Sequence, residues 1–321
     1  MASNRVIRFL KKLKPYNIQK GLRYLKHFGL KEFLVRLSER MEPEEVPYGP
    51  WYEEHRAKPE ELERQRKQSL TWENFSGGEE SACVFSIAVP VFRTPAKFLC
   101  EMIESVRSQS FPFWELCLAN ADPEDREVAE ILERYCREDR RIRVKNLKEN
   151  KGISENTNAA LAMARGEFVG LLDHDDLLAP DALYEMAARL EKDGGIDVFY
   201  TDEDKVTTDL SEHFQPHLKP DFNLDLLRSN NYICHFFVVR REIAERIGGF
   251  RPEFNGAQDY DFIFRCTEQA EKIVHIPRIL YHWRVHSAST ADNPASKMYA
   301  YEAGKRAIEG NLERSGVRGV V

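Results

Sequence analysis

The 321-residue chain lacks several patterns that would assign it quickly. Its six cysteines form no Cys-x-x-Cys pair, so we expect reduced thiols rather than a disulfide framework. No apolar run approaches the roughly 20 residues that a bilayer-spanning helix needs, and we see no apolar signal-peptide core. Gly-x-Gly-x-x-Gly and Gly-x-x-x-x-Gly-Lys-Ser/Thr loops are missing, which excludes two common ways of holding nucleotide phosphates. We therefore expect a cytoplasmic protein that neutralises any bound phosphate by other means.

The composition is that of an ordinary globular protein. Hydrophobic residues make up 42% of the chain and charged residues 31%, which is enough to build a packed core. The net charge of −6 and the absence of RNP-type or zinc-finger patterns exclude a general nucleic-acid binder. We accordingly expect no nucleic-acid partner.

The first 40 residues differ in charge from the rest of the chain. They hold eleven Lys and Arg residues against only Glu32 and Glu39, and apolar residues recur there at helical spacing. A basic amphipathic helix can lie on an anionic membrane surface, which would make the protein peripheral at the inner face of the membrane. The alternatives are packing against the main domain or self-association with a second subunit.

The remainder of the chain alternates between expected strands and helices. Apolar stretches at 84–91, 114–119, 142–146 and 168–172 are expected strands, separated by helical patterns at 96–108, 128–135 and 157–164. Such alternation predicts an α/β fold with a mixed, mostly parallel sheet flanked by helices and an N-terminal helical extension. We divide the chain into a basic arm and linker (1–80, with one helix at 59–68), a main domain (81–312) and a tail (313–321).

A cluster of carboxylates follows the apolar run at 168–172. Asp173, Asp175 and Asp176 lie within four positions, and like charges so close together resist desolvation. A divalent cation such as Mg²⁺ or Mn²⁺ would remove that cost, and ligands of α/β sheets bind at the carboxyl ends of strands. The other interpretation is a solvated loop that caps a helix starting near Pro180.

Several motifs in a fixed order resemble family 2 glycosyltransferases, in particular the bacterial polysaccharide and rhamnan-type branch. They are AVPV at 88–91, SVRSQS at 105–110, NKGISENTNAA at 150–160, GEFVGLLDHDD at 166–176, YTDED at 200–204, GAQDYD at 256–261 and YHWRVH at 281–286. The resemblance covers roughly residues 83–310 and implies a GT-A (Rossmann-like) fold. It also implies an inverting, metal-dependent enzyme that uses dTDP-rhamnose or a UDP-sugar in cell-surface polysaccharide biosynthesis. The acceptor would be an oligosaccharide or a lipid-linked saccharide.

The resemblance assigns the carboxylate cluster and a distant histidine to metal and diphosphate. Asp173 and Asp175 would hold Mn²⁺ or Mg²⁺ against the diphosphate, with Asp176 as a helper or a cap. His286 matches a position of a further metal or phosphate contact, and the alternative is a surface histidine beside a polar loop. Because no His-Glu-x-x-His is present, a zinc hydrolase is disfavoured.

Asp259 is the candidate general base by the same resemblance. It matches the second acid of a Glu-Asp pair, although Gln258 replaces the first. A positioned carboxylate can take the proton of an acceptor hydroxyl in the transition state. The alternative is that Gln258 and Asp259 cap the helix that follows.

The remaining assignments concern the nucleotide and the sugar. Pro90, Val91 and Asn120 are expected near the nucleobase, where Asn120 replaces an acid of the family and can still pair with a base edge. Gly152 and Asn156 would lie against the nucleotide, or serve only as loop and helix-cap residues. Asp202 and Asp204 would contact sugar hydroxyls, or be solvated acids at the end of a strand.

Two other functions compete with glycosyl transfer. A sugar nucleotidyltransferase would need a glycine-rich basic loop after the first strand, where only Arg93 is basic. A non-catalytic nucleotide-sugar-binding or scaffold domain of a larger synthase would keep the donor site but carry no activity. Hydrolysis of a nucleotide-sugar with Mn²⁺ would separate these readings.

Overall fold

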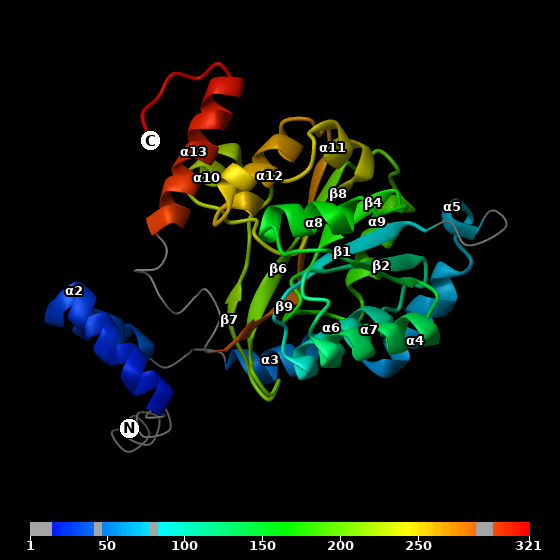
Figure 1. Ribbon diagram of the computed structural model, residues 1–321, viewed down its shortest axis with the longest axis horizontal. Helices are drawn as coiled ribbons and strands as arrows, with labels where there is room; N and C mark the ends of the chain where they lie inside the picture. The colour runs from blue at the N-terminus through cyan, green and yellow to red at the C-terminus, as the bar shows by residue number, and fades with distance from the viewer. Residues whose placement is uncertain (1–14, 42–46, 77–82, 287–297) are drawn as a thin grey trace.

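The computed structural model describes residues 15–41, 47–76, 83–286 and 298–321. Within these ranges a nine-stranded sheet carries helices on both faces, with strand order β3-β2-β1-β4-β8-β6-β9-β5 and β7 paired to β6 (Figure 1). The strands are β1 (Phe85–Val91), β2 (Trp114–Asn120), β3 (Ile142–Asn146), β4 (Phe168–Leu171), β5 (Leu177–Leu178), β6 (Val198–Thr207), β7 (His213–His217), β8 (Phe237–Arg240) and β9 (Ile273–Val285). The helices are α2 (Pro15–Met41), α3 (Tyr48–His55), α4 (Pro59–Ser69), α5 (Glu73–Ser76), α6 (Ala96–Arg107), α7 (Arg126–Glu138), α8 (Ile153–Leu161), α9 (Ala182–Leu190), α10 (Leu224–Ser229), α11 (Arg241–Arg246), the 3-10 turn η1 (Pro252–Phe254), α12 (Gln258–Thr267) and α13 (Met298–Arg314).

One half of the sheet is parallel and matches the expected α/β pattern. β1 pairs in parallel with both β2 and β4, and β2 pairs in parallel with β3. Every residue of β1 and β2 is buried, because helices cover both faces of a parallel sheet. This arrangement brings the carboxyl ends of β4, β1 and β2 side by side.

The other half of the sheet is mixed. β8 runs antiparallel to β4 and β6, whereas β6 and β9 are parallel along most of their lengths. β6 extends from Val198 to Thr207, and β9 is one continuous strand, because the two strands pair with each other along these lengths. Alternate residues enter two cores: Val238 packs with α6 and α9, and Val239 packs with α11 and α12.

The segment predicted as a linker with one helix differs from that expectation. α3, α4 and α5 lie within it, and Trp72 and Phe75 of its last part join the main core beside Phe111. Tyr48 and Tyr52 of α3 form a smaller apolar cluster with β9. Large aromatic side chains anchor α3 and α5, whereas the buried residues of α4 are Gln65 and Ser69. At the other end, α13 continues beyond the predicted domain end at 312.

α2 is interrupted at Gly29, whose φ of 79° lies in the left-handed region that favours glycine. A Cβ at Gly21 would lie 3.4 Å from the Phe33 ring, so the parts of α2 on either side of the interruption pack on each other. Figure 1 draws α2 to one side of the sheet. No helix among the described residues combines the length and apolar character needed to cross a membrane.

Candidate functional site

The carboxylate cluster follows β4 at the carboxyl end of the parallel sheet. The backbone N–H of Leu172 still donates to the carbonyl of Ala88 in β1, at 3.2 Å, and the chain then leaves the sheet. The Asp173 side chain is 51% exposed, and that of Asp175 is 20% exposed. Both carboxylates therefore can meet a ligand from solvent at the edge where α/β folds bind ligands.

Asp176 is a buried structural residue of this loop. Its carboxylate accepts hydrogen bonds from the Tyr281 hydroxyl at 2.6 Å and from the Arg284 backbone N–H at 2.8 Å. Burial raises the pKa of Asp176 well above its ordinary value. These contacts fasten the loop to β9. The capping interpretation of the cluster does not match the described structure, since α9 begins at Ala182 without a side-chain cap.

The structure brings Asp175 and His286 together although they lie 111 positions apart. The Asp175 Oδ2 atom and the His286 Nε2 atom are 2.7 Å apart, and the Arg284 Nε–H donates to the Asp175 carbonyl at 2.7 Å. A carboxylate and an imidazole suit Mn²⁺ or Mg²⁺. The ligand atoms that lie within 4.8 Å of the Asp173 carboxylate in one group are those of Asp176 and His235. The buried Nη2 atom of Arg284 has no hydrogen-bond partner among the described residues, which suits a site for an anion. The donor set thus fits a metal-bound diphosphate.

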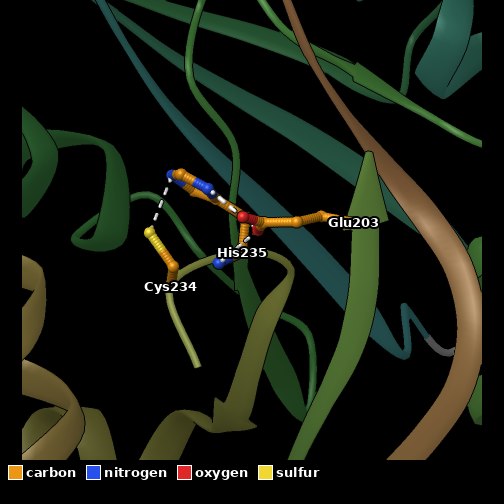
Figure 2. Close-up of side chains that lie close together, drawn as sticks. All are labelled: Glu203, Cys234 and His235. Carbon is orange, nitrogen blue, oxygen red and sulfur yellow. Dashed lines mark hydrogen bonds and ion pairs between the residues drawn. The ribbon is translucent and has the colours of Figure 1, made fainter. Parts of the chain in front are cut away.

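Two further residues lie at this site without having been predicted from the sequence, Glu203 and His235. The His235 Nδ1 atom lies 3.2 Å from Glu203 Oε2, and its Nε2 atom lies 3.7 Å from Asp173 Oδ2. Figure 2 shows the imidazole between the Glu203 carboxylate and the Cys234 thiol, whose sulfur is 3.9 Å from Nε2. No local motif marks His235, whereas Glu203 lies inside the motif at 200–204, where only its two Asp residues were singled out.

Glu203 is a buried hub of charge. Burial alone would raise its pKa, but hydrogen bonds from His217 and His235 and the ammonium of Lys219 hold the pKa of Glu203 well below its ordinary value. The Lys219 side chain is fully buried, with Nζ 3.3 Å from Glu203 Oε2. An ionised carboxylate is thus fixed close to the predicted diphosphate site.

Asp259, the candidate base, lies in the first turn of α12. The Asn231 side-chain amide donates to Asp259 Oδ2 at 2.8 Å. The cap position belongs to Ala257, so the capping alternative for Asp259 does not match the structure. Gln258 Oε1 instead accepts from the Gly256 backbone N–H at 2.8 Å.

The residues predicted near the nucleobase lie at the ends of β1 and β2. Pro90 and Val91 are buried at the end of β1, and Val91 pairs in register with Asn120. The Asn120 amide donates to Asn146 Oδ1 at 3.0 Å, and its oxygen accepts from the Asp122 backbone N–H at 3.1 Å. Asn120 therefore closes a strand-end turn, and its predicted base contact stays a prediction.

Gly152 and Asn156 lie at the start of α8, which packs on β1 and β2. Gly152 occupies the N-cap with a φ of 97°, where a Cβ would approach the Asn255 amide to 3.2 Å. The Asn156 amide donates to Asn150 Oδ1 at 2.8 Å, while its buried oxygen has no hydrogen-bond partner among the described residues. That free acceptor fits a hydrogen-bond donor on a ligand.

Asp202 and Asp204 are buried and already hydrogen-bonded to protein. Asp202 accepts from the Lys219 backbone N–H at 2.9 Å and contacts His275 Nε2 at 2.8 Å. Asp204 accepts from the Tyr48 hydroxyl at 2.7 Å and contacts the Nδ1 atoms of two histidines, His213 at 2.8 Å and His282 at 2.6 Å. Their predicted contact with sugar hydroxyls remains a prediction, in competition with these structural roles.

The proteins with similar sequences include an uncharacterised protein and a protein of bacterial O-antigen biosynthesis. The uncharacterized protein y4gI of Sinorhizobium fredii is 43% identical over 72% of this chain and 26% of its own length. The O-antigen biosynthesis protein RfbC of Myxococcus xanthus is 37% identical over 73% of this chain and 18% of its own length. The chain therefore spans about a quarter or less of these relatives.

Two solved structures share the fold. TarS of S. aureus, in complex with UDP-GlcNAc, matches with a TM-score of 0.60 at 22% identity, covering 71% of this chain and 66% of TarS. The mannosyltransferase PcManGT of Pyrobaculum calidifontis, in complex with GDP-Man and Mn²⁺, matches with a TM-score of 0.50 at 17% identity, covering 81% and 83% of the two chains. The expected GT-A fold, a mixed α/β sheet flanked by helices, is confirmed. The profile described as "Glycosyl transferase family 2" matches residues 86–248, and the chain belongs to that family.

Proposed function

We propose that the protein is an inverting, metal-dependent glycosyltransferase of cell-surface polysaccharide biosynthesis. It moves a sugar from a nucleotide-diphosphate donor, dTDP-rhamnose or a UDP-sugar, to an oligosaccharide or lipid-linked saccharide. The observation that carries the proposal is the 2.7 Å approach of His286 to Asp175, beside Asp173, at the sheet edge of a family 2 domain. The name of RfbC supports polysaccharide assembly, and the TarS and PcManGT complexes support nucleotide-sugar donors.

Asp173, Asp175 and His286 would hold the metal. A bound Mn²⁺ or Mg²⁺ supplies Lewis-acid neutralisation of the diphosphate leaving group. The buried guanidinium of Arg284 pairs with Glu101 and donates to the Asp175 carbonyl, and its Nη2 atom is the part proposed to face the diphosphate. Pro90, Val91, Asn120, Gly152 and Asn156 are proposed to hold the nucleotide, and Asp202 and Asp204 the sugar.

Asp259 is proposed to act as the general base. Its carboxylate takes the acceptor hydroxyl proton while the acceptor oxygen bonds to the anomeric carbon and the bond to the diphosphate oxygen breaks. The products are the glycosylated acceptor and a nucleoside diphosphate. With one base and one displacement, the anomeric configuration inverts.

The first test is binding of nucleoside diphosphates followed by melting temperature, with and without Mn²⁺. Specific binding stabilises by about 2.7 kcal/mol at a hundredfold excess over Kd. We expect a metal-dependent shift with UDP or dTDP that Asp175→Ala removes. Asp225→Ala, which changes an acid whose side chain is 93% exposed, is the matched control and keeps the shift.

The second test is turnover of UDP- and dTDP-sugars with Mn²⁺, which separates the competing functions. Donor hydrolysis or transfer that Asp175→Ala abolishes supports the proposal. A protein that binds UDP yet turns over no donor supports the scaffold function. Formation of pyrophosphate from a nucleoside triphosphate and a sugar phosphate supports a nucleotidyltransferase.

We also propose that α2 contacts an anionic membrane surface, where a lipid-linked acceptor would lie. Leu22, Leu30 and Leu34 are 60%, 62% and 52% exposed on this basic segment. We expect the protein to float with phosphatidylglycerol vesicles and not with phosphatidylcholine vesicles, and the triple change of these leucines to Ser to abolish flotation. A concentration-dependent dimer without flotation would favour self-association instead.

A further inference from the structure

The segment 231–235 connects the two parts of the proposed active site. At one end, the Asn231 amide donates to Asp259 Oδ2 at 2.8 Å. At the other end, His235 Nε2 lies 3.7 Å from Asp173 Oδ2. The predicted base and the predicted diphosphate-binding carboxylate are thus both in contact with the same short stretch of chain.

The buried charges of Glu203 and Lys219 hold this segment in place. Glu203 Oε2 accepts from the His235 backbone N–H at 3.1 Å and lies 3.2 Å from its Nδ1 atom. The Lys219 ammonium donates to the carbonyls of Ile233, at 2.7 Å, and of His235. Because a buried ion pair is tolerable only when its remaining donors and acceptors are satisfied, this geometry has little freedom.

The His235 ring is also fixed on its face. It stacks on Tyr281 with ring centroids 4.6 Å apart and planes 10° from parallel. The Tyr281 hydroxyl in turn donates to Asp176 and lies 3.4 Å from the Asp173 backbone nitrogen, which donates to it. With Nδ1 directed at Glu203, the Nε2 atom is the one that faces Asp173, at 3.7 Å, and the Cys234 sulfur, at 3.9 Å.

We propose that residues 231–235 form a positioning segment, in which Asn231 orients Asp259 and His235 orients Asp173, with Glu203 and Lys219 as its anchors. The inference rests on the proposed function and deepens it. Neither Asn231 nor His235 has to touch the reacting atoms. A site built this way keeps base and leaving group at a fixed separation, and small misplacements of such groups are costly to turnover.

The experiment compares matched substitutions by steady-state kinetics and by calorimetric binding of UDP or dTDP with Mn²⁺. Asn231→Ala is paired with Asn74→Ala, since the Asn74 amide also donates to a carboxylate at 2.8 Å, on Glu191. His235→Asn and His235→Gln are paired with His213→Gln, because His213 also faces a β6 carboxylate and is 17% exposed against 20% for His235.

We expect substitutions at Asn231 to change kcat and substitutions at His235 to change nucleotide binding. Asn231→Ala lowers kcat about 10- to 100-fold, the usual cost of losing an outer-shell partner, and leaves nucleotide Kd unchanged. His235→Asn weakens nucleotide binding by a similar factor of about 10 to 100. His235→Gln recovers part of that loss, because its amide nitrogen can reach the place of Nε2. Asn74→Ala keeps kcat and nucleotide Kd, and His213→Gln keeps the Kd for UDP or dTDP.

Several results would overturn the inference. One is a His235→Asn protein that binds nucleotide like His213→Gln; another is an Asn231→Ala protein with normal kcat. Equal losses of kcat and binding at both positions would indicate a merely structural role. Asn231→Leu, which is close in size and removes the donor without adding a charge beside Asp259, replaces Asn231→Ala if that variant does not fold. Failure of the unaltered protein to bind any nucleotide would instead reject the proposed function, and the inference with it.

Discussion

Glu203 and Asp204 are consecutive acids of β6 that serve two different regions of the molecule. Glu203 gathers Lys219, His217 and His235, next to Asp173. Asp204 gathers two histidines and the Tyr48 hydroxyl, next to α3. Both carboxylates are buried. Burial alone would raise their pKa values, but their hydrogen-bonding and charged partners lower both pKa values below the ordinary ones.

The difference between the two clusters lies in what the partners do. Glu203 holds a segment that reaches the proposed reacting groups, whereas Asp204 holds α3 against the sheet beside its proposed contact with the sugar. Because side chains alternate along a strand, neighbouring residues can be assigned to separate tasks on opposite faces. Two consecutive acids that look like one motif in the sequence therefore belong to two separate side-chain clusters in the structure.

The largest expected effect is a loss of turnover without a loss of nucleotide binding. Asp259→Asn should lower kcat by about 10²–10⁴-fold, the range for loss of a general base, and leave metal-dependent nucleotide binding intact. Rapid-quench or steady-state transfer assays measure the loss. Asp225→Asn, in the first turn of α10, is the matched control. Turnover of Asp259→Asn within a factor of about three of the unaltered protein would contradict its role as base.

The next effect concerns the Glu203 cluster. Glu203→Gln leaves the fully buried Lys219 ammonium without a counter-charge, which costs about 3–5 kcal/mol of unfolding free energy. Urea denaturation measures this loss. The double variant Glu203→Gln/Lys219→Met should regain most of it, since both charges are then gone. If the double variant is no more stable than Glu203→Gln, the unpaired Lys219 charge is not the cause of the lost stability.

On the Asp204 face we expect a smaller loss, of folding stability and not of nucleotide binding. Tyr48→Phe removes a hydrogen bond to a buried carboxylate, at a cost of about 1.5–3 kcal/mol. The binding of UDP or dTDP should not change. Tyr301→Phe, at a residue that is 67% exposed, is the control for removing a hydroxyl. A loss of nucleotide binding in Tyr48→Phe would show that the two faces are not independent.

The smallest effect is a pH dependence. Burial alone would raise the pKa of Asp204, but His282 and the hydrogen bonds from His213 and His282 bring it below its ordinary 3.8. A depressed carboxyl pKa stabilises the fold above the ordinary value, and this contribution is lost as the pH falls below it. Asp204→Asn should therefore flatten the acid slope of the unfolding free energy, by at most about 1.4 kcal/mol per pH unit. Equal slopes below pH 4 would contradict this.

Much of the fold could be predicted from the sequence because the signals are local. The strands at 85–91, 114–120 and 142–146 are short apolar runs between helical patterns, and the acids at 173–176 follow such a run directly. The continuous strand β9 could not be predicted, since its length depends on pairing with β6. α3 and α5 were missed because a few aromatic residues, rather than an apolar stripe, hold them.

The site divides in the same way. Asp173, Asp175 and Asp259 were predicted through motifs, and His286 was predicted as a metal or phosphate contact only through the family resemblance. Glu203, Lys219 and His235 were missed because their contacts join β6, the segment after β7 and the segment before β8, and no spacing in the sequence marks them. Contacts across such turns depend on register, which a single sequence does not reveal.

The docking of α3 sets the limits within which this domain can be moved into another protein. A fragment cut at the predicted boundary of 81 would discard Tyr48 and Tyr52, which cover Ile279 and bind Asp204 and His282. It would expose an apolar patch and leave buried polar groups without their partners, both of which favour aggregation. A transplantable unit therefore has to begin before Tyr48, so that α3 travels with the sheet it closes.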